Sequence, residues 1–334
     1  MKTISGIHGG GQILRTSLTL SMITGQAFRM THIRAQRRKP GLMRQHLTCV
    51  KAAVAICNAS LEGAEIGSTE LTFCPGAITA GDYVFAIGSA GSTSLLAQTL
   101  LPALWHASAP STLTLEGGTH NPLALPSHFL DEIYLGTLRK LGLDVRCTLQ
   151  EHGFAPAGGG RIHLQIQPCA GLSSLILLER GPQEGWEMEV IARNLDWSIA
   201  ERVNAATEKT FPHATIRRSH LKGGPGQGIC SLLRGGFSQT SDMFCAFGEM
   251  GITAEAMAKG VTYQAKQYLA SQAAVSHHLA DQLLLPLALH QGGEFTTLKP
   301  DLHFLTNRDT IQTFLPEITI HTEVRDSQYF VRIV

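Results

Sequence analysis

Apolar and polar positions follow two periods along the chain, and together they predict a mixed α/β fold. Apolar residues recur at helical spacing behind the glycines at 9–11 and predict a helix that runs to about residue 24; they include Ile13, Leu14, Leu18 and Met22. Strict alternation predicts strands, because successive side chains of a strand point to opposite faces. The first unit continues with a strand over 28–34, a basic turn, a helix over 42–57 and a strand over 70–73.

The same order of helix, strand, turn, helix and strand recurs twice more. The second copy has a helix from 88–92 to about 107, a strand over 112–116, a turn at 117–122, a helix over 127–141 and a strand over 144–149. The third has a helix over 273–290, a strand over 294–298, a turn at 299–303, a helix over 304–314 and a strand over 317–322. We interpret the three units as repeats on their order and periodicity. A pseudo-threefold arrangement would gather the three turns at one end, where loops usually bind and catalyse.

Residues 180–270 break this pattern and predict a separate α+β insert between the second and third units, with a Gly-rich loop at 223–228 and a helix over about 254–269. A chain of 334 residues favours two domains over one. We therefore predict a large α/β (α+β) domain of three split β-α-β units over 1–178 and 272–334, and a smaller insert domain over 179–271.

Composition excludes some classes of protein. A hydrophobic fraction of 43% with 16% charged residues is typical of a folded globular chain, and a net charge of +1 gives no overall basic field for nucleic acid. Nucleic-acid contacts would have to come from a local cluster: Arg34, Arg37, Arg38, Lys39 and Arg44. The alternative is a solvated basic loop, which is the commoner outcome for such a run. The seven cysteines lack metal-binding spacing, and the chain shows neither a signal peptide nor an apolar span. We expect a cytoplasmic protein with reduced thiols and no membrane contact.

Two glycine-rich turns precede predicted helices and are candidate phosphate sites. Backbone N–H groups and the dipole at a helix N-terminus favour an anion. Gly9–Gly11 are followed by Arg15, which could hold a phosphate through two hydrogen bonds, and the GSAGS turn at 88–92 could form a second cradle. The alternative is that both are ordinary turns, the second with serine caps.

His303 and Asp281 are the strongest candidates for chemistry. His303 follows a Pro-Asp turn directly before a helix, and a neutral imidazole is abundant near pH 7 and is nucleophilic. Asp281 and Gln282 interrupt a strongly apolar helix, where a buried carboxylate needs a partner. The alternatives are a helix-start hydrogen bond for His303 and a structural ion pair for Asp281.

The segment HGFAPAGGGRI at 152–162 resembles the signature of the RNA 3′-terminal phosphate cyclase family. GGGQILR (9–15), RKPGLMRQH (38–46), GSAGS (88–92), LADQLLLP (279–286) and HFLTN (303–307) extend the resemblance from about Gly9 to the C-terminus. The family fold implied is three split β-α-β units interrupted by a smaller domain. The activity implied is a ligase reaction that uses ATP to convert an RNA 3′-phosphate into a 2′,3′-cyclic phosphate, releasing AMP and diphosphate. It would pass through a histidine–AMP intermediate and an RNA–adenylate anhydride.

The resemblance also implies a set of site residues. His303, Arg15 and Asp281 would be catalytic, with His303 carrying the AMP. The nucleotide would contact Gln98, His278, Leu279, Ala280, Asp281 and Gln282. The RNA 3′-phosphate end or the ATP phosphates would contact Arg15, Arg34, Arg37 and Gln45. ATP and a divalent cation, Mg²⁺ or Mn²⁺, are the cofactors implied, and the HGFAPAGGG loop would be scaffold.

Two residues depart from the family pattern. His8 stands where the family has a metal-binding Glu; imidazole is a poor Mg²⁺ ligand and suits Mn²⁺, Co²⁺ or Zn²⁺ better, so His8 is the candidate metal ligand. His278 stands where the family has a Tyr that stacks on adenine. Three alternatives remain: a non-enzymatic RNA-binding homologue in ribosome assembly, an enolpyruvyl transferase of similar architecture, and a cyclase disabled at its N-terminus. An exposed edge strand at 329–334 could pair in a homodimer.

Overall fold

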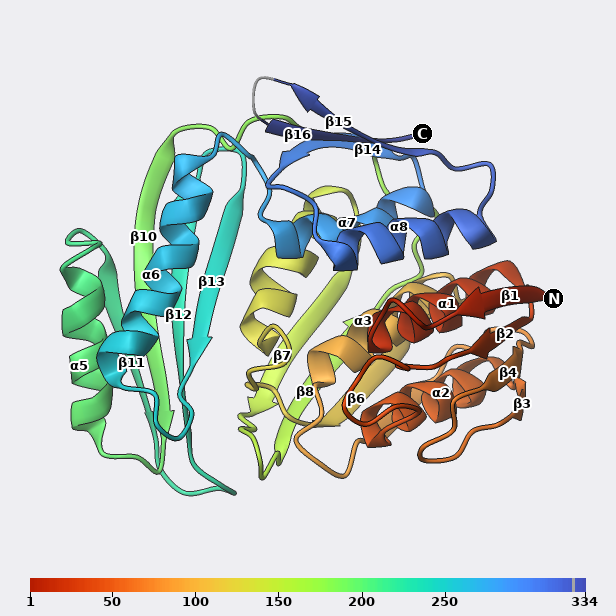
Figure 1. Ribbon diagram of the computed structural model, residues 1–334, viewed down its shortest axis with the longest axis horizontal. Coiled ribbons are helices and arrows are strands. Elements are labelled where there is room, and N and C mark those ends of the chain that lie inside the picture. Colours follow the sequence, from red (N-terminus) through yellow and green to blue (C-terminus); the bar gives the residue numbers. More distant parts are fainter. Residues whose placement is uncertain (326–327) are drawn as a thin grey trace.

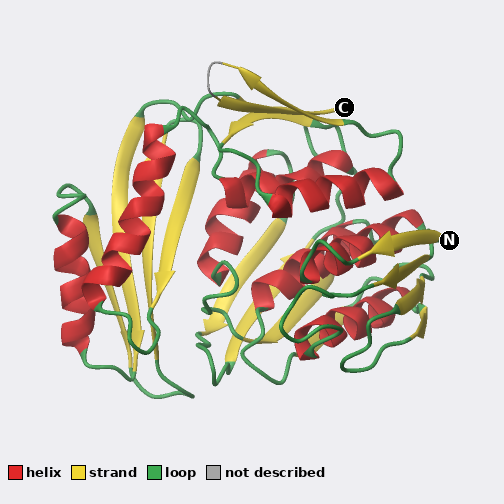
Figure 2. Ribbon diagram, in the orientation of Figure 1, coloured by secondary structure: helices red, strands yellow, loops and turns green. Residues whose placement is uncertain are grey.

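Three four-stranded sheets with one shared strand order form most of the molecule in this computed structural model, which describes residues 1–325 and 328–334 (Figures 1 and 2). In each sheet the first strand pairs in parallel with the second, which pairs antiparallel with the fourth, and the third lies outermost beside the fourth. The parallel pair needs a crossover connection, and a helix supplies it. We call the three units repeats one, two and three.

Repeat one consists of β1 (Lys2–Ser5), α1 (Gly11–Thr24), β2 (Phe28–Thr31), α2 (Arg44–Cys57), β3 (Ser60–Glu62) and β4 (Leu71–Cys74). Repeat two consists of β5 (Asp82–Ala86), α3 (Thr93–Trp105), β6 (Ser111–Gly117), the π-helix η1 (Phe129–Leu135), α4 (Gly136–Lys140), β7 (Val145–Glu151) and β8 (Gly160–Ile166). Repeat three consists of β9 (Leu175–Leu177), α7 (His277–Ala288), β14 (Gly293–Thr297), α8 (Leu302–Phe314), β15 (Ile320–Arg325) and β16 (Gln328–Ile333). The predicted α+β fold with three repeats is thus confirmed, and each copy gains strands that the sequence pattern did not reveal.

The insert interrupts repeat three, between β9 and α7, rather than lying between repeats two and three as predicted. It consists of β10 (Gln183–Arg193), α5 (Trp197–Glu208), β11 (Thr215–Leu221), β12 (Gly228–Phe237), β13 (Ser241–Phe247) and α6 (Ala254–Ala270). Its strand order, β11-β10-β12-β13, differs from that of the repeats. Its apolar side chains include Trp186, Val203, Val261 and Tyr268 and form a hydrophobic cluster of their own.

The helices of the repeats pack together in the middle of the molecule, where α1 contacts α2, α3 and α8, and α7 contacts α8 (Figure 1). Their buried side chains join one large hydrophobic cluster with the inner faces of the three sheets. This packing brings the N-terminal ends of α1, α3, α7 and α8 close to one another. Gln12 on α1 and His303 on α8, for example, are in contact although 291 positions separate them in sequence. No helix in the described part of the chain is long and apolar enough to cross a membrane.

Several local predictions differ from the structure. The strand predicted as an exposed edge is β16, which lies between β14 and β15, so the argument for a homodimer through this edge is wrong. The helix predicted over 127–141 is η1 followed by α4. His303 does not precede its helix but is the second residue of α8. All seven cysteines are free, and Cys49, Cys57 and Cys230 are buried.

Candidate active site

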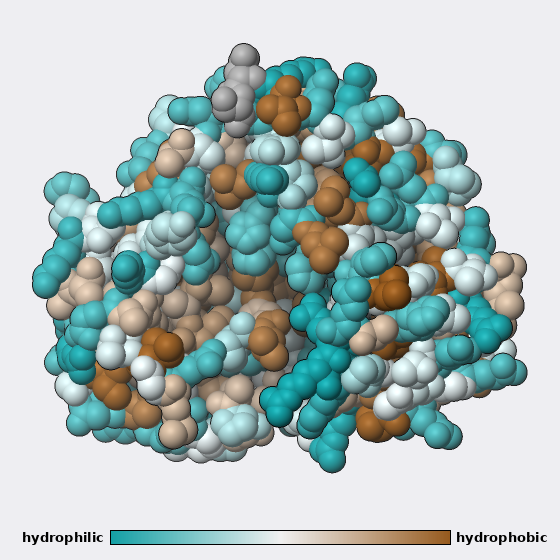
Figure 3. All heavy atoms as spheres, in the orientation of Figure 1, coloured by the Kyte–Doolittle hydropathy of each residue, from teal (hydrophilic) through white to brown (hydrophobic). Residues whose placement is uncertain are grey.

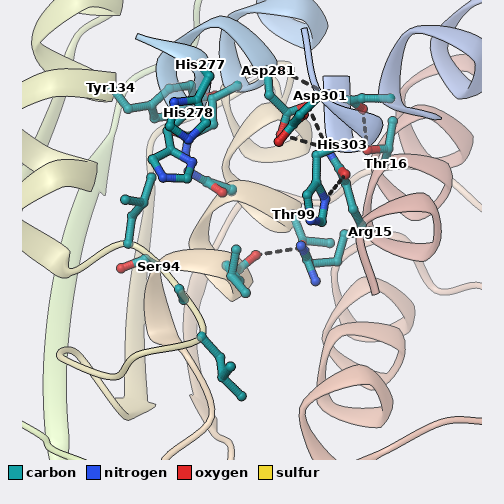
Figure 4. Close-up of a pocket in the computed structure, with 18 of the residues that line it drawn as sticks. Arg15, Thr16, Ser94, Thr99, Tyr134, His277, His278, Asp281, Asp301 and His303 are labelled. Atoms are coloured by element: carbon teal, nitrogen blue, oxygen red, sulfur yellow. Dashed lines mark hydrogen bonds between the residues drawn. The ribbon is translucent and has the colours of Figure 1, made fainter. Parts of the chain in front are cut away.

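A cavity of about 560 Å³ lies where four helices begin. Gln12 and Arg15 reach it from α1, Ser94 and Gln98 from α3, and further lining residues come from α7 and α8; they include His277, His278, Asp281, Gln282, Asp301, His303 and Asn307. Figure 4 shows Arg15, Asp281 and His303 directed toward one another from three helices, and Figure 3 shows this face hollowed between the insert and repeat one. A cavity of this size suits a ligand as large as a nucleotide.

Each of the four helices begins at the cavity, directly after a capping residue or a glycine. Ser92 caps α3 by accepting a hydrogen bond from Leu95 N (3.2 Å), and Asp301 caps α8 by accepting one from Phe304 N (2.9 Å). Ser276 precedes α7, and Gly10 precedes α1. The first N–H groups of a helix lack intrahelical partners and carry the positive end of its dipole. Four such ends around one cavity favour a polyanion such as a triphosphate.

Glycine is required at the start of α1 because other groups approach its backbone closely. A Cβ at Gly11 would collide with the imidazole of His46 and with Arg15 Nη1, and a Cβ at Gly10 would lie 3.0 Å from Arg37 Nη2. Arg15 and Arg37 therefore both lie beside the first turn of α1, as expected for a phosphate-binding helix start.

A chain of hydrogen bonds connects His303 to Asp281 through Gln12. The Gln12 side-chain Nε2 donates to both carboxylate oxygens of Asp281, at 2.6 and 2.7 Å. Its Oε1 lies 2.7 Å from His303 Nδ1. A carboxylate accepts hydrogen bonds, so it orients the amide nitrogen of Gln12 toward itself and leaves Oε1 as the acceptor for His303. Nδ1 of His303 must then carry the proton, and Nε2 keeps its lone pair.

Asn307 and Thr16 extend this chain one helical turn further. Thr16 Oγ1 donates to Asn307 Oδ1 (2.8 Å), which turns the Asn307 amide nitrogen toward Asp281. Asn307 Nδ2 then donates to the Asp281 side chain (3.0 Å) and to its backbone carbonyl (2.9 Å). Gln12 and Thr16 on α1, and His303 and Asn307 on α8, are each spaced by one turn, so one face of each helix meets Asp281 on α7.

The electrostatics of the site centre on Asp281 and Arg15. Burial raises the pKa of Asp281 to about 7, although the hydrogen bonds from Gln12 and Asn307 act to lower it. Burial also lowers the pKa of Arg15 from its ordinary value, while Cys49 and Asp281 act in the opposite direction. The cavity thus holds a guanidinium with little solvation of its own, which favours an anionic ligand.

One wall of the cavity is apolar and includes residues of the insert. Leu95, Leu285 and Tyr134 come from the repeats, whereas Phe247 comes from β13. Tyr134 belongs to the π-helix, a form that is rare and often found at functional sites. The cavity therefore combines a polar, cationic side with an apolar side, as a nucleotide with phosphates and a base requires.

Six of the residues predicted from sequence line the cavity: Arg15, Gln98, His278, Asp281, Gln282 and His303. Leu279 and Ala280 do not, because their side chains are buried in the hydrophobic core. Their side chains therefore pack between helices instead of facing a ligand in the cavity.

Arg34, Arg37 and Gln45 lie beside the cavity and not on its lining. Arg34 Nη1 donates to the carbonyls of Lys39 (2.8 Å) and Gly41 (2.7 Å) and so holds the basic turn. Gln45 Oε1 accepts from Ser92 N (3.0 Å) at the start of α3. Arg34 and Gln45 therefore support the loops around the cavity, and the exposed Arg37 lies beside Gly10 at the start of α1.

The predicted metal ligand His8 is exposed in the loop before α1 and is not one of the residues that line the cavity. Within the described residues, the cavity brings together no group of three metal-binding side chains. Its carboxylates are Asp281, which accepts from Gln12 and Asn307, and Asp301, which caps α8. The donor set fits a Mg²⁺ or Mn²⁺ ion only if the phosphates of a bound nucleotide supply most of its oxygen ligands, as is common for Mg²⁺.

Sequence reasoning missed Gln12, Thr16, Asn307 and Asp301 as site residues. A signal was present for three of them, because Gln12 and Thr16 are polar residues one turn apart beside Arg15, and Asn307 follows His303 by one turn. That these faces meet at Asp281 depends on the packing of three distant helices, which the sequence alone does not show.

Comparisons with known proteins identify the family of the chain. The family model described as RNA 3′-terminal phosphate cyclase matches residues 7–320. The RNA 3′-terminal phosphate cyclase of Salmonella enteritidis is 46% identical over 326 residues, covering 98% of this chain and 96% of the relative. That of Salmonella agona is 47% identical over 316 residues, covering 95% and 92%. That of Ectopseudomonas mendocina is 45% identical over 325 residues, covering 97% and 95%.

Among solved structures, the enolpyruvyl transferase NikO from Streptomyces tendae aligns with a TM-score of 0.39 at 10% identity, over 99% of this chain and 48% of that one. This likeness is too weak to bear on fold or activity. The family match and the full-length relatives, in contrast, cover almost every element described above. The chain therefore belongs to the RNA 3′-terminal phosphate cyclase family.

Proposed function

We propose that this chain uses ATP to convert an RNA 3′-phosphate end into a 2′,3′-cyclic phosphate. The observation that carries the proposal is the hydrogen bond between His303 Nδ1 and Gln12 Oε1, which leaves Nε2 of a cavity histidine free as a nucleophile. The surrounding helix N-termini and Arg15 provide the positive environment that a triphosphate needs. The names of the relatives supply the substrate class.

In the first step, His303 Nε2 attacks the α-phosphorus of ATP. A bond forms between Nε2 and phosphorus, the bond from phosphorus to the bridging oxygen breaks, and diphosphate leaves with that electron pair. The imidazole then carries a positive charge, with its Nδ1 proton held by Gln12. The Asp281 carboxylate, on the other side of Gln12, stabilises this charge, as an oriented acid does beside a catalytic histidine. Arg15 lies at the same end of the cavity to contact the phosphate oxygens.

In the following steps, an oxygen of the RNA 3′-phosphate attacks the phosphorus of the histidine-bound AMP and frees His303. The product is an RNA–adenylate anhydride. The neighbouring 2′-hydroxyl then attacks the RNA phosphorus, loses its proton and expels AMP, which leaves the cyclic phosphate. Arg15 and Arg37, both beside the start of α1, are the cations best placed to hold the two phosphates.

The proposal assigns a supporting role to the insert, which we place at residues 179–271. Cys245 and Phe247 on β13 and Gln264 on α6 line the cavity opposite α1. The cavity is therefore incomplete without the insert. The apolar surface that Phe247 adds suits the base of the nucleotide, near His278 on α7.

A divalent cation would neutralise the triphosphate and is held, in this proposal, chiefly by the nucleotide itself. A homologue that binds RNA without turnover, for example in ribosome assembly, is the second candidate. The observation that favours it is His8, exposed, at the position where the family resemblance implies a metal-binding Glu. The presence of His303 and its orientation by Gln12 favour the enzyme.

The test is conversion of a labelled RNA oligonucleotide with a 3′-phosphate, incubated with ATP and either Mg²⁺ or Mn²⁺. Wild type should give a product whose 3′ end resists phosphatase, and His303→Ala should give none. His163→Gln is the matched control, because His163 lies on β8 and pairs with Thr114 outside the cavity. RNA binding without conversion in either metal would contradict the proposal and support the second candidate.

A further inference from the structure

Three histidines of repeat two come together outside the cavity. His120 and His128 flank the turn after β6, and His152 follows β7; each offers one nitrogen, and the three nitrogens lie within 4.8 Å of one another. His120 Nε2 is 3.0 Å from His128 Nδ1, and the rings of His120 and His152 stack at 5.1 Å between centroids. We call these residues the histidine cluster. They play no part in the reaction proposed above.

The cluster has an outer shell that orients its buried member. His120 is only 1% exposed, and its Nδ1 lies 2.8 Å from Thr119 Oγ1. Thr119 Oγ1 also accepts from Gly153 N (2.8 Å), so the loop that carries His152 is tied to the same hydroxyl. Phe154 also stacks on the His120 ring, at 5.2 Å between centroids. Metal-binding histidines commonly have their second nitrogen held in this way.

The contact between His120 and His128 is suited to a cation. Two imidazole nitrogens at 3.0 Å share one proton in the metal-free protein. A metal ion with nitrogen ligands at about 2.0–2.1 Å in tetrahedral geometry sets those nitrogens about 3.3 Å apart. The ion would replace the shared proton, which moves to the outer nitrogen of His128, so that three neutral imidazoles face the ion.

The cationic side chains around the cluster are compensated by carboxylates. Three guanidinium groups of the insert, those of Arg193, Arg217 and Arg234, lie close by, and four carboxylates pair with them: Glu132, Glu151, Glu187 and Glu189. The carboxylates outnumber the guanidiniums, and each of the three guanidiniums is already paired.

We propose that His120, His128 and His152 bind one first-row transition-metal ion in a structural site separate from the ATP cavity. Ligands that are all imidazoles suit Zn²⁺, Co²⁺, Ni²⁺ or Cu²⁺ and do not suit Mg²⁺. His152 must turn out of its stack on His120 when the ion binds, because both lone pairs have to point at the same atom. The half-buried side chains of His128 and His152 leave the ion a route from solvent.

The ion would join two loops that already meet through hydrogen bonds from Thr119 N and His120 N to Gly153 O, both 2.9 Å. One is the turn 117–128, whose Pro122 and Leu125 line the ATP cavity; the other is the HGFAPAGGG loop that packs on the insert, where a Cβ at Gly228 would collide with Phe154. Metal binding would therefore stiffen one wall of the cavity from behind. The signature loop, which gave no chemistry of its own in the sequence, gains a role through His152.

The test uses Co²⁺ as the probe, because its visible absorption reports the number and geometry of its ligands. Metal-stripped wild type should bind one Co²⁺ per chain with the intense bands of a four-coordinate site, and Zn²⁺ should displace it. His128→Gln should weaken Co²⁺ binding at least about 100-fold, more than the loss of an outer-shell partner costs. His163→Gln, on the same sheet, and His303→Ala, in the cavity, should bind as wild type does.

Three outcomes would overturn the site: no Co²⁺ uptake by wild type, bands of a six-coordinate aqua-like ion, or uptake that survives in His128→Gln. Uptake lost in His303→Ala and kept in His128→Gln would place the ion in the cavity and would also overturn it. If His128→Gln does not fold, as judged by its thermal transition, the wild-type spectrum and its stoichiometry decide the question. The reaction proposed for the cavity does not depend on the result.

Discussion

The candidate active-site cavity and the histidine cluster both bring histidines together, but they do so in opposite ways. In the cavity, His303 contacts an amide, Gln12, whose orientation is fixed by a carboxylate. In the cluster, His120 contacts His128 directly, and a hydroxyl holds its second nitrogen. An imidazole held alone by an acceptor keeps one defined lone pair, which makes it a nucleophile. Imidazoles that face one another compete for a proton, and a metal ion relieves that competition.

The group that hydrogen-bonds to a histidine therefore indicates the chemistry of that histidine better than the number of histidines nearby. The two sites can be measured separately, because covalent labelling by ATP depends on the cavity and Co²⁺ uptake depends on the cluster. Variants of the cavity residues should change the rate of covalent labelling and leave Co²⁺ uptake as in wild type.

Removal of the cavity guanidinium should have the largest effect. Arg15→Ala should slow the formation of the covalent AMP adduct about 10²–10³-fold, the range seen when one preorganised donor to a developing anion is lost. Arg15→Lys should recover only part of the rate, because a point charge does not match a phosphate as a planar guanidinium does. Single-turnover labelling with α-labelled ATP measures both. An Arg15→Ala rate within threefold of wild type would exclude Arg15 from phosphate binding.

Loss of the amide that sets the His303 tautomer should have the next largest effect. Gln12→Leu keeps a side chain of similar size but removes the acceptor for Nδ1–H, and we expect labelling to slow about 10–100-fold. The Co²⁺ spectrum of the cluster serves as the control for folding. An unchanged labelling rate would show that Gln12 does not orient the nucleophile. The hydrogen-bond partner of His303 would then not explain its difference from His120.

The rate of labelling should depend on pH through Asp281. Burial raises the pKa of this carboxyl to about 7, so the carboxylate that holds Gln12 forms fully only above that pH. The rate should therefore fall as pH is lowered through 7, by about tenfold between pH 8 and pH 6 for a single ionisation. Asp281→Asn should react slowly, at a rate that does not fall between pH 8 and pH 6. The same fall in rate in Asp281→Asn would assign the ionisation to another group, such as the ATP phosphates.

The raised pKa of Asp281 also makes the stability of the fold depend on pH. Because the folded protein binds this proton more tightly than the unfolded chain, the contribution of Asp281 to stability is full at acid pH and is lost as pH rises through 7. Asp281→Asn should accordingly gain in melting temperature relative to wild type between pH 5 and pH 8.

The smallest effect should come from the far end of the hydrogen-bond chain. Thr16→Val removes the donor to Asn307 Oδ1 at nearly constant volume, at a cost of about 1 kcal/mol, and the labelling rate should fall about fivefold. A loss larger than that of Gln12→Leu would mean that the order of importance does not follow distance from His303. The melting temperature of the variant separates a local loss from unfolding.

The sequence predicted the repeats well because periodicity and turn residues are local signals. The helix starts at Gly11 and Thr93 follow directly from the glycine and serine turns before them. The strand β8 was hidden inside the signature loop, and β9 is only three residues long, so neither gave a clear period. The short β9 is also the reason that the insert was placed between two repeats, when it lies within the third.

The site was predicted in part, and the missing part has one physical cause. His303, Asp281 and Arg15 stand out in sequence as a turn-flanking imidazole, a carboxylate in an apolar helix and a cation behind glycines. Gln12 and Asn307 acquire their roles only when α1, α7 and α8 pack side by side. Leu279 and Ala280, in turn, were carried over with a motif whose apolar residues prove to face the core. The histidine cluster likewise depends on two loops meeting, which no spacing within either loop reveals.

The most direct test of the central claim is to map the covalent nucleotide. Wild-type protein incubated with ATP and Mg²⁺ or Mn²⁺ would be digested under alkaline conditions, which preserve a phosphoramidate, and the peptides sequenced by tandem mass spectrometry. The account predicts one AMP adduct on His303 and none in His303→Ala. An adduct on a lysine, on His277 or on His278, or none in either metal, would contradict it.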